Sequence, residues 1–100
     1  MSDTHLQVGY VSRAHGLKGE VAIKTFDPGS TSLLEIPRVL LRLRGGGEKA
    51  LALASLRQTP REFLVHLQGI THRSASEPLV GATVLAFRED LPAPEEGEYF

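Results

Sequence analysis

The sequence contains no cysteine among its 100 residues, which excludes disulfide bonds, thiolate zinc sites and a cysteine nucleophile, and indicates a reducing compartment, the cytoplasm. It also lacks any apolar run close to the roughly 18 residues that a membrane span requires. The first five residues contain neither a basic nor an apolar region, so we expect no signal peptide there. With 41% hydrophobic and 23% charged residues, the composition is that of one soluble globular domain and not of a disordered segment.

The net charge of −1 conceals an uneven distribution along the chain. Residues 1–72 contain nine Lys or Arg and six Asp or Glu, a net charge of +3, whereas residues 73–100 contain two and six, a net charge of −4. This balance is not the strongly basic one of a stand-alone nucleic-acid-binding protein. The acidic residues near the end, Glu95, Glu96 and Glu98, are typical of a solvated tail.

Short stretches of alternating polarity, separated by Gly and Pro, predict β-strands. We expect six strands, at residues 6–12, 20–26, 38–44, 48–57, 63–67 and 82–87. The first strand would place Leu6, Val8 and Tyr10 on one face. In the second, Val21 and Ile23 would point inward. The other inward residues expected are Val39, Leu41 and Leu43 in the third strand and Phe63, Val65 and Leu67 in the fifth, with Leu64 and His66 on the outer face of the fifth.

One segment departs from the strand pattern. Ser74-Ala75-Ser76-Glu77 has the form of a capping box, in which Ser74 would be the N-cap and Glu77 would reach back to it. The segment predicts a single short helix between the fifth and sixth strands.

Six strands with one short helix define an all-β domain. Closing a sheet into a barrel removes its exposed edges completely, whereas a two-layer sandwich hides them only in part. About 100 residues supply too few strands for two well-covered sheets, so we expect a closed six-stranded β-barrel. We assign residues 1–92 to the barrel and residues 93–100 to an acidic extended segment.

The four histidines raise the question of a metal site. No two of them stand at the helical i, i+4 spacing, and no cluster of Asp or Glu accompanies them. We therefore expect no metal and no cofactor. The histidines are His5, His15, His66 and His72.

A catalytic group is equally unsupported by the sequence. Ser12, His15 and Glu20 are close in sequence, but neighbours on one hairpin seldom converge in a pocket as a nucleophile and its base must. The glycines of residues 16–19 and 45–47 lack the spacing of a phosphate-binding loop. We expect tight turns there, with Leu17 covering the end of the barrel and its neighbouring basic side chains pointing outward. No catalytic residue is predicted.

Basic residues are the remaining candidates for binding. A solvated outer face of a sheet is the favoured explanation for them, because only Tyr10 and Phe26 are near enough to stack on bases. The alternative is that these charges contact phosphate groups or a protein. The first hairpin contributes Arg13, His15, Lys18 and Lys24, and the third strand contributes Arg38, Arg42 and Arg44.

Four stretches, in order, resemble the RimM family of bacterial ribosome maturation factors. Residues 8–21 resemble the family's opening, a glycine-bearing strand followed by a His-Gly-Leu-Lys-Gly-Glu turn and a second strand. Residues 67–73 are similar to its Gly-Ile/Val-Thr-x-Arg segment. Glu77, Leu79 and Gly81 match its short helix. Residues 91–100, from Leu91-Pro92 to an aromatic pair, resemble its interdomain segment.

This resemblance implies a barrel similar to domain II of translation factors, followed in the family by a PRC barrel that is not within these 100 residues. It implies a non-catalytic assembly chaperone for the head of the small (30S) ribosomal subunit that promotes 16S rRNA processing. The implied partners are small-subunit precursors, the nineteenth small-subunit protein and 16S rRNA, with no membrane and a monomeric protein. Tyr99 and Phe100 join the four residues of the first hairpin as expected binding residues. An RNA-binding barrel that acts on another RNA is the alternative.

Overall fold

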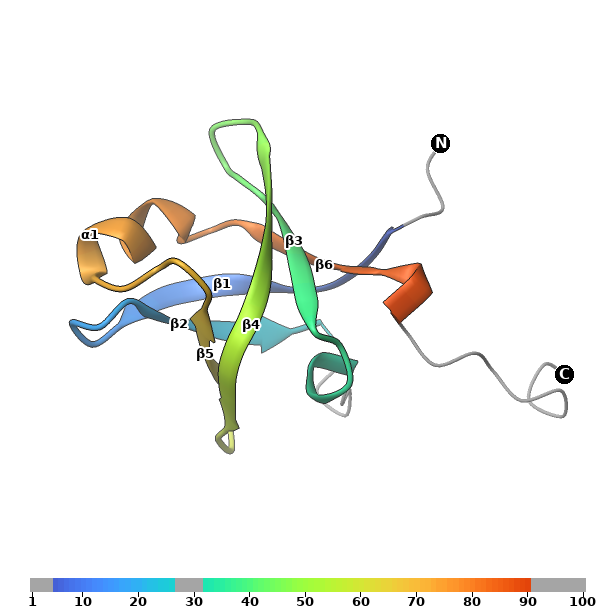
Figure 1. The fold of residues 1–100 in the computed structure, drawn as a ribbon, viewed down its shortest axis with the longest axis horizontal. Coiled ribbons are helices and arrows are strands. Elements are labelled where there is room, and N and C mark those ends of the chain that lie inside the picture. The colour runs from blue at the N-terminus through green and yellow to red at the C-terminus, as the bar shows by residue number, and fades with distance from the viewer. Residues whose placement is uncertain (1–4, 27–31, 91–100) are drawn as a thin grey trace, which may run out of the picture.

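Six strands build the fold, with one short α-helix between the fifth and the sixth (Figure 1). The structure is a computed structural model that describes residues 5–26 and 32–90, so the predicted acidic segment and its residues Tyr99 and Phe100 lie outside the described residues. The strands are β1 (His5–His15), β2 (Glu20–Thr25), β3 (Arg38–Arg42), β4 (Glu48–Gln58), β5 (Phe63–Leu67) and β6 (Thr83–Phe87). The helices are α1 (Arg73–Ser76) and the 3-10 turns η1 (Ser32–Leu34), η2 (Glu77–Leu79) and η3 (Arg88–Asp90).

The strands close into a barrel in the order β1-β2-β5-β4-β3-β6. Every neighbouring pair is antiparallel. The long strand β4 completes the closure, because its first half pairs with β3 and its second half pairs with β5. The predicted closed six-stranded barrel is confirmed. No helix among the described residues is long and apolar enough to cross a membrane.

The core follows the predicted alternation in β2, β3 and β5. The inward residues are fully or almost fully buried because they fill the interior of the barrel, where removing apolar surface from water stabilises the fold by about 25 cal/mol per Å². Leu43 and three leucines of β4 are partly buried and pack against this core. The buried inward residues are Val21, Ile23, Val39, Leu41, Phe63, Val65 and Leu67.

In β1 the predicted single face of Leu6, Val8 and Tyr10 is wrong. Val8 is buried, whereas Leu6 and Tyr10 are 39% and 38% exposed. The pairing register shifts twice along β1, between Gln7 and Gly9 and between Val11 and Arg13. Each shift places an extra residue in the strand, so the side chains beyond it change face.

Leu64, which the sequence places on the outer face of β5, is nevertheless only 6% exposed. Its neighbours across the sheet are Ala22 on β2 and Arg57 on β4. Arg57 forms an ion pair with Glu20 of β2, at 3.3 Å, and this pair spans β5 on its outer side. The burial of Leu64 follows from this cover.

The predicted helix is present, but the predicted capping box is wrong. The N-cap of α1 is His72 and makes no side-chain capping bond, so Ser74 lies inside the helix. Glu77 instead pairs with Nε of Arg73 at 2.9 Å. The backbone N–H of Arg73 donates to the carbonyl of Leu17 in the β1–β2 turn, at 3.1 Å. This tertiary contact satisfies the N–H of Arg73, one of the N–H groups at the start of a helix that have no partner within it.

Candidate functional site

Three of the four predicted hairpin residues share one outer face of the barrel. Across the β1–β2 ladder, Arg13 is opposite Ala22, His15 is opposite Glu20 and Tyr10 is opposite Lys24. Partners across a ladder point to the same side of the sheet, and so do alternate residues of one strand. Arg13, His15 and Lys24 therefore lie together outside the core.

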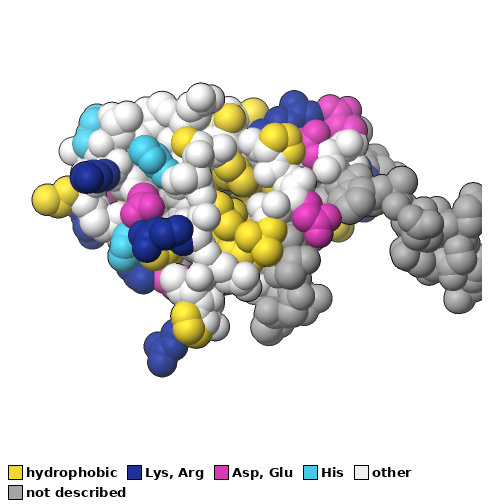
Figure 2. Space-filling model, turned by 60° about the horizontal axis from the view of Figure 1, so that its bottom comes forward, with side chains coloured by type: hydrophobic (Ala, Val, Ile, Leu, Met, Phe, Trp, Pro, Cys, Tyr) yellow, Lys and Arg dark blue, Asp and Glu magenta, His cyan; other side chains and the backbone are white. Residues whose placement is uncertain are grey.

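Figure 2 shows Lys, Arg and His side chains gathered on the half of the molecule that holds the β1–β2 turn and α1. Lys18 lies within that turn and is exposed.

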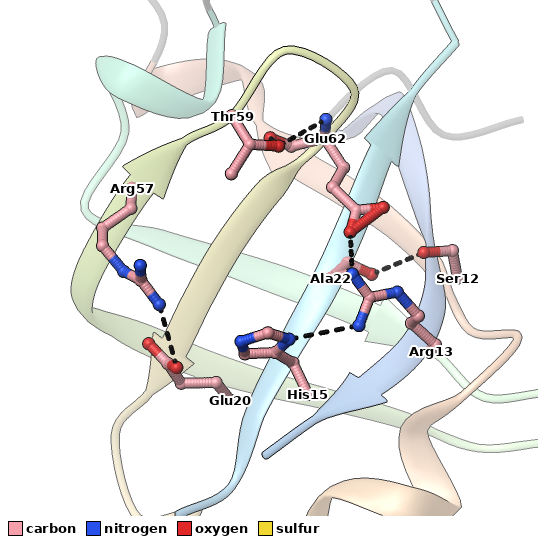
Figure 3. A network of polar contacts seen from close by, with 8 residues as sticks. All are labelled: Ser12, Arg13, His15, Glu20, Ala22, Arg57, Thr59 and Glu62. Carbon is pink, nitrogen blue, oxygen red and sulfur yellow. Dashed lines mark hydrogen bonds and ion pairs between the residues drawn. The ribbon is translucent and has the colours of Figure 1, made fainter.

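Arg13 is the centre of a polar network on this face (Figure 3). Its Nη2 forms an ion pair with Oε2 of Glu62 at 2.5 Å, and its Nη1 donates to Nδ1 of His15 at 3.1 Å. Because a guanidinium only donates hydrogen bonds, Nδ1 of His15 is the acceptor in this contact. The Glu62 side chain is 8% exposed and that of Arg13 is 53% exposed. Glu62 thus ties the β4–β5 turn to β1.

Sequence reasoning missed Glu62. The residue lies in a turn between two strands, a position where a carboxylate is ordinarily solvated. Its burial depends on Arg13, which is 49 residues away in the sequence. No local pattern contains this information.

Ser12, His15 and Glu20, which are close in sequence, each form a hydrogen bond or ion pair with a residue outside this group. The Ser12 hydroxyl donates to the carbonyl of Ala22 at 3.2 Å. His15 contacts Arg13, and Glu20 pairs with Arg57. Among the described residues, no recorded contact joins these three side chains to one another.

A groove of about 440 Å³ lies beside this network, between β1–β2 and the β4–β5 turn. Arg13, Lys24, Arg61 and Glu62 supply its charged lining. A second groove, of about 350 Å³, shares Lys24, Arg61 and Glu62 and extends toward Phe63. Both grooves are therefore lined by Lys24 and Arg61, two cations that form no ion pair with any described residue.

The arginines of β3 do not form a free basic row. Arg38 pairs through Nε with Asp90 at 2.7 Å and through Nη2 with Glu89 at 2.5 Å, and its guanidinium lies 3.9 Å from the centroid of the Phe87 ring. The hydrogen bonds that Arg38 donates, first to Asp90 and then to Glu89, raise its pKa. Arg42 pairs with Glu48 at 3.1 Å.

Arg44 follows β3, and Cγ and Cδ of its side chain lie close to Gly81. Arg38 and Arg42 are thus already paired with carboxylates, whereas Lys18 and Lys24 of the first hairpin have no ion pair with any described residue.

An exposed pair of aromatic rings lies next to Lys24. Tyr10 and Phe26 are stacked with centroids 6.0 Å apart and an interplanar angle of 28°. Tyr10 is 38% exposed and Phe26 is 54% exposed. The N–H of Phe26 donates to the carbonyl of Val8 at 3.0 Å, which extends the β1–β2 pairing to this residue.

The expectation that Leu17 covers the end of the barrel is wrong, because Leu17 is 79% exposed. Its backbone is held instead. The Leu17 carbonyl accepts from the Arg73 N–H at 3.1 Å, and Nη1 of Arg73 donates to the carbonyl of Gly16 at 3.4 Å. The tip of the β1–β2 hairpin is therefore fixed on the α1 segment with the Leu17 side chain directed to solvent.

Comparison with known proteins gives one consistent family. The family model that describes the RimM N-terminal domain matches residues 6–91 of the sequence. The ribosome maturation factor RimM of Myxococcus xanthus is 51% identical over 96 residues, which cover 96% of this chain and 51% of that protein. The RimM of Sorangium cellulosum is 33% identical over 100 residues, which cover 100% of this chain and 59% of that protein. The chain thus spans about half the length of these curated relatives.

Solved structures show the same fold. The solution structure of the N-terminal domain of RimM from Thermus thermophilus aligns with a TM-score of 0.75 and 31% identity, covering 91% of this chain and 98% of that domain. A RimM crystal structure from Pseudomonas aeruginosa aligns with a TM-score of 0.77 over 91% of this chain and 55% of that one. Its identity is 23%, so it bears on the fold alone.

Proposed function

This chain belongs to the RimM family of ribosome maturation factors, and from this membership we propose that it acts as a non-catalytic assembly chaperone for the head of the small ribosomal subunit. In this role it promotes processing of 16S rRNA. Its partners are small-subunit precursors, through a ribosomal protein of the head (the nineteenth of the small subunit), through pre-rRNA, or through both. The site of action is the cytoplasm, and the protein acts as a monomer.

The observation that carries the proposal is the family match over residues 6–91, which includes all the paired residues of the β1–β2 hairpin. That hairpin directs its basic side chains outward, and its tip is hydrogen-bonded to Arg73. A preformed, outward-facing basic element is suited to docking, because little conformational freedom is lost on binding. If the protein binds one conformation of the head more tightly than the others, its binding increases the fraction of subunits in that conformation.

Capture of small-subunit precursors tests the proposal. The immobilised chain is incubated with precursor and mature small subunits at low and at moderate salt. We expect preferential retention of the precursors. We expect Lys18→Glu, at the hairpin tip, to weaken retention more at low salt than at moderate salt, because it reverses a charge in the contact. Lys49→Glu is the matched control, since Lys49 is an exposed lysine at the start of β4.

Three outcomes decide between the alternatives. Equal retention of wild type and Lys18→Glu at both salts would make the tip a purely structural turn. Retention of RNAs unrelated to the small subunit with no preference for its precursors would favour an RNA-binding barrel that acts on another RNA. Loss of all retention, with recovery when the C-terminal half of the Myxococcus xanthus relative is fused to this chain, would place the main contact in that half.

A further inference from the structure

We infer that Tyr10, Lys24, Phe26 and Arg61 form a binding site for an unpaired RNA nucleotide, whose base stacks on the exposed ring surface and whose phosphate contacts the two cations. This inference rests on the proposed function, because it names RNA as the direct partner of this barrel and assigns the residues that bind it.

The first support is the exposed aromatic surface. Of the other aromatic residues that the structure describes, Phe63 is 4% exposed and Phe87 is in contact with His5 and Arg38. Tyr10 and Phe26, by contrast, come from two strands, stack on each other and keep 38% and 54% of their surface in solvent. Rings left uncovered by the fold in this way offer a flat apolar surface on which any base can stack.

The second support is the distribution of charge. Five arginines of the described residues have a carboxylate partner: Arg13, Arg38, Arg42, Arg57 and Arg73. Lys24 and Arg61 have no ion pair recorded with any described residue, and both line the grooves around the β4–β5 turn. The one carboxylate in that lining, Glu62, is already neutralised by Arg13. The groove therefore keeps positive charge that a phosphate can use.

The third support is that the exposed rings and Lys24 of the cationic groove lie on the same side of the sheet. Tyr10 and Lys24 are partners in the β1–β2 ladder, so their side chains leave the sheet on the same side. Phe26 follows two residues after Lys24 and reaches the ring of Tyr10. A ring surface beside a cationic groove is the arrangement by which proteins hold single-stranded nucleic acid with little sequence preference.

The test uses the 100-residue chain and a fluorescently labelled oligouridylate of about ten nucleotides, within the length that a small barrel covers. Binding is followed by fluorescence anisotropy at several salt concentrations. Phe26→Leu keeps an apolar side chain but removes the ring, and we expect it to weaken binding roughly tenfold. Phe26→Tyr keeps the ring and is expected to bind within about twofold of wild type.

The charge is tested in the same assay. We expect Lys24→Gln to weaken binding and to reduce the slope of log affinity against log salt by about 0.7, the value for one phosphate contact on a single strand. Lys49→Gln, on β4 and outside the grooves, is expected to change neither quantity. Circular dichroism of each variant confirms that the barrel is intact.

The results separate this inference from the proposed function. Equal affinities for wild type, Phe26→Leu and Phe26→Tyr, or no binding of the oligonucleotide at low salt, would overturn the RNA site. If the same proteins still retained small-subunit precursors, the assembly role would stand with a protein as the direct partner. Binding of the oligonucleotide without retention of precursors, either by this chain or by its fusion to the C-terminal half of the Myxococcus xanthus relative, would support the RNA site and contradict the assembly role.

Discussion

Gly19 gives the sharpest test of how the β1–β2 hairpin is built. Its φ is +94°, and a Cβ added there would lie 2.6 Å from the carbonyl oxygen of Ile70 and 2.9 Å from the backbone nitrogen of His72. Gly69 has a φ of +89° with nothing within 4 Å of an added Cβ, and Gly16, in the same turn as Gly19, has a φ of +74° and equal space. The three glycines therefore share the conformational requirement, and only Gly19 adds a steric one.

The expected costs follow from this difference. A left-handed conformation costs a residue other than glycine about 1 kcal/mol, so Gly16→Ala and Gly69→Ala should lower the free energy of unfolding by about that amount. Gly19→Ala also forces a Cβ against backbone atoms, which cannot rotate away, and overpacking of this kind adds about 2 kcal/mol. The total for Gly19→Ala is about 3 kcal/mol. For a domain of this size each kcal/mol lowers Tm by about 5 °C.

Urea unfolding followed by far-ultraviolet circular dichroism measures these costs, with thermal unfolding as a second measurement. We expect Gly19→Ala to lower Tm by about 15 °C and the two control variants to lower it by about 5 °C each. A Gly19→Ala variant that is no less stable than Gly69→Ala would refute the close approach between the hairpin tip and residues 70–72. The m-values of all the variants should agree, which would show that the unfolded state is unchanged.

Four further predictions concern ion pairs and the core. Arg13→Ala should lower the free energy of unfolding, measured in urea, by about 1–2 kcal/mol, because it leaves the buried Glu62 carboxylate without its cation. Glu62→Gln keeps an acceptor for Arg13 and should lower it less. A larger loss for Glu62→Gln than for Arg13→Ala would contradict the geometry. Arg38→Gln should speed amide hydrogen exchange in residues 88–90 while the strands stay protected, and uniform exchange would argue against a local role. The carboxylate partners of Arg38 raise its pKa in the folded state. The stability that Arg38 contributes is therefore fully present below its unfolded pKa and is lost only as the pH rises through the higher folded pKa. The Tm difference between wild type and Arg38→Gln should thus be the same at pH 7 and pH 9. Leu41→Ala, at a fully buried position, should cost about 2–5 kcal/mol in the same urea assay, and a loss below about 1 kcal/mol would contradict its place in the core.

The fold was largely predictable because its dominant signal is local. Alternation with a period of two identified the inward residues of β2, β3 and β5, and the small number of strands favoured closure into a barrel. In β1 the same reasoning failed at Tyr10, because bulges depend on how β2 and β6 pair with the strand. It failed again at Ser74, where a contact between Arg73 and Leu17 determines how the helix begins.

The candidate site was predictable only in part, for the same reason. The sequence places Arg13, His15 and Lys24 on one hairpin, and the structure brings them to one face. Nothing local indicates that Arg61 joins Lys24 at a groove or that Glu62 is buried under Arg13. These relations depend on the adjacency of β2 and β5, which are separated by more than 35 residues in the sequence.

The anchoring of η3 by Arg38 has a consequence for longer members of the family. It fixes where the chain leaves the barrel, at the end remote from the β1–β2 turn (Figure 1). In relatives about twice as long, the remaining half is joined beyond that point. If both the β1–β2 hairpin and the remaining half of such a relative bind the same partner, the two contacts are joined through one folded barrel. With one of them bound, the other rebinds at a high effective concentration, so such a protein can stay attached while either contact changes.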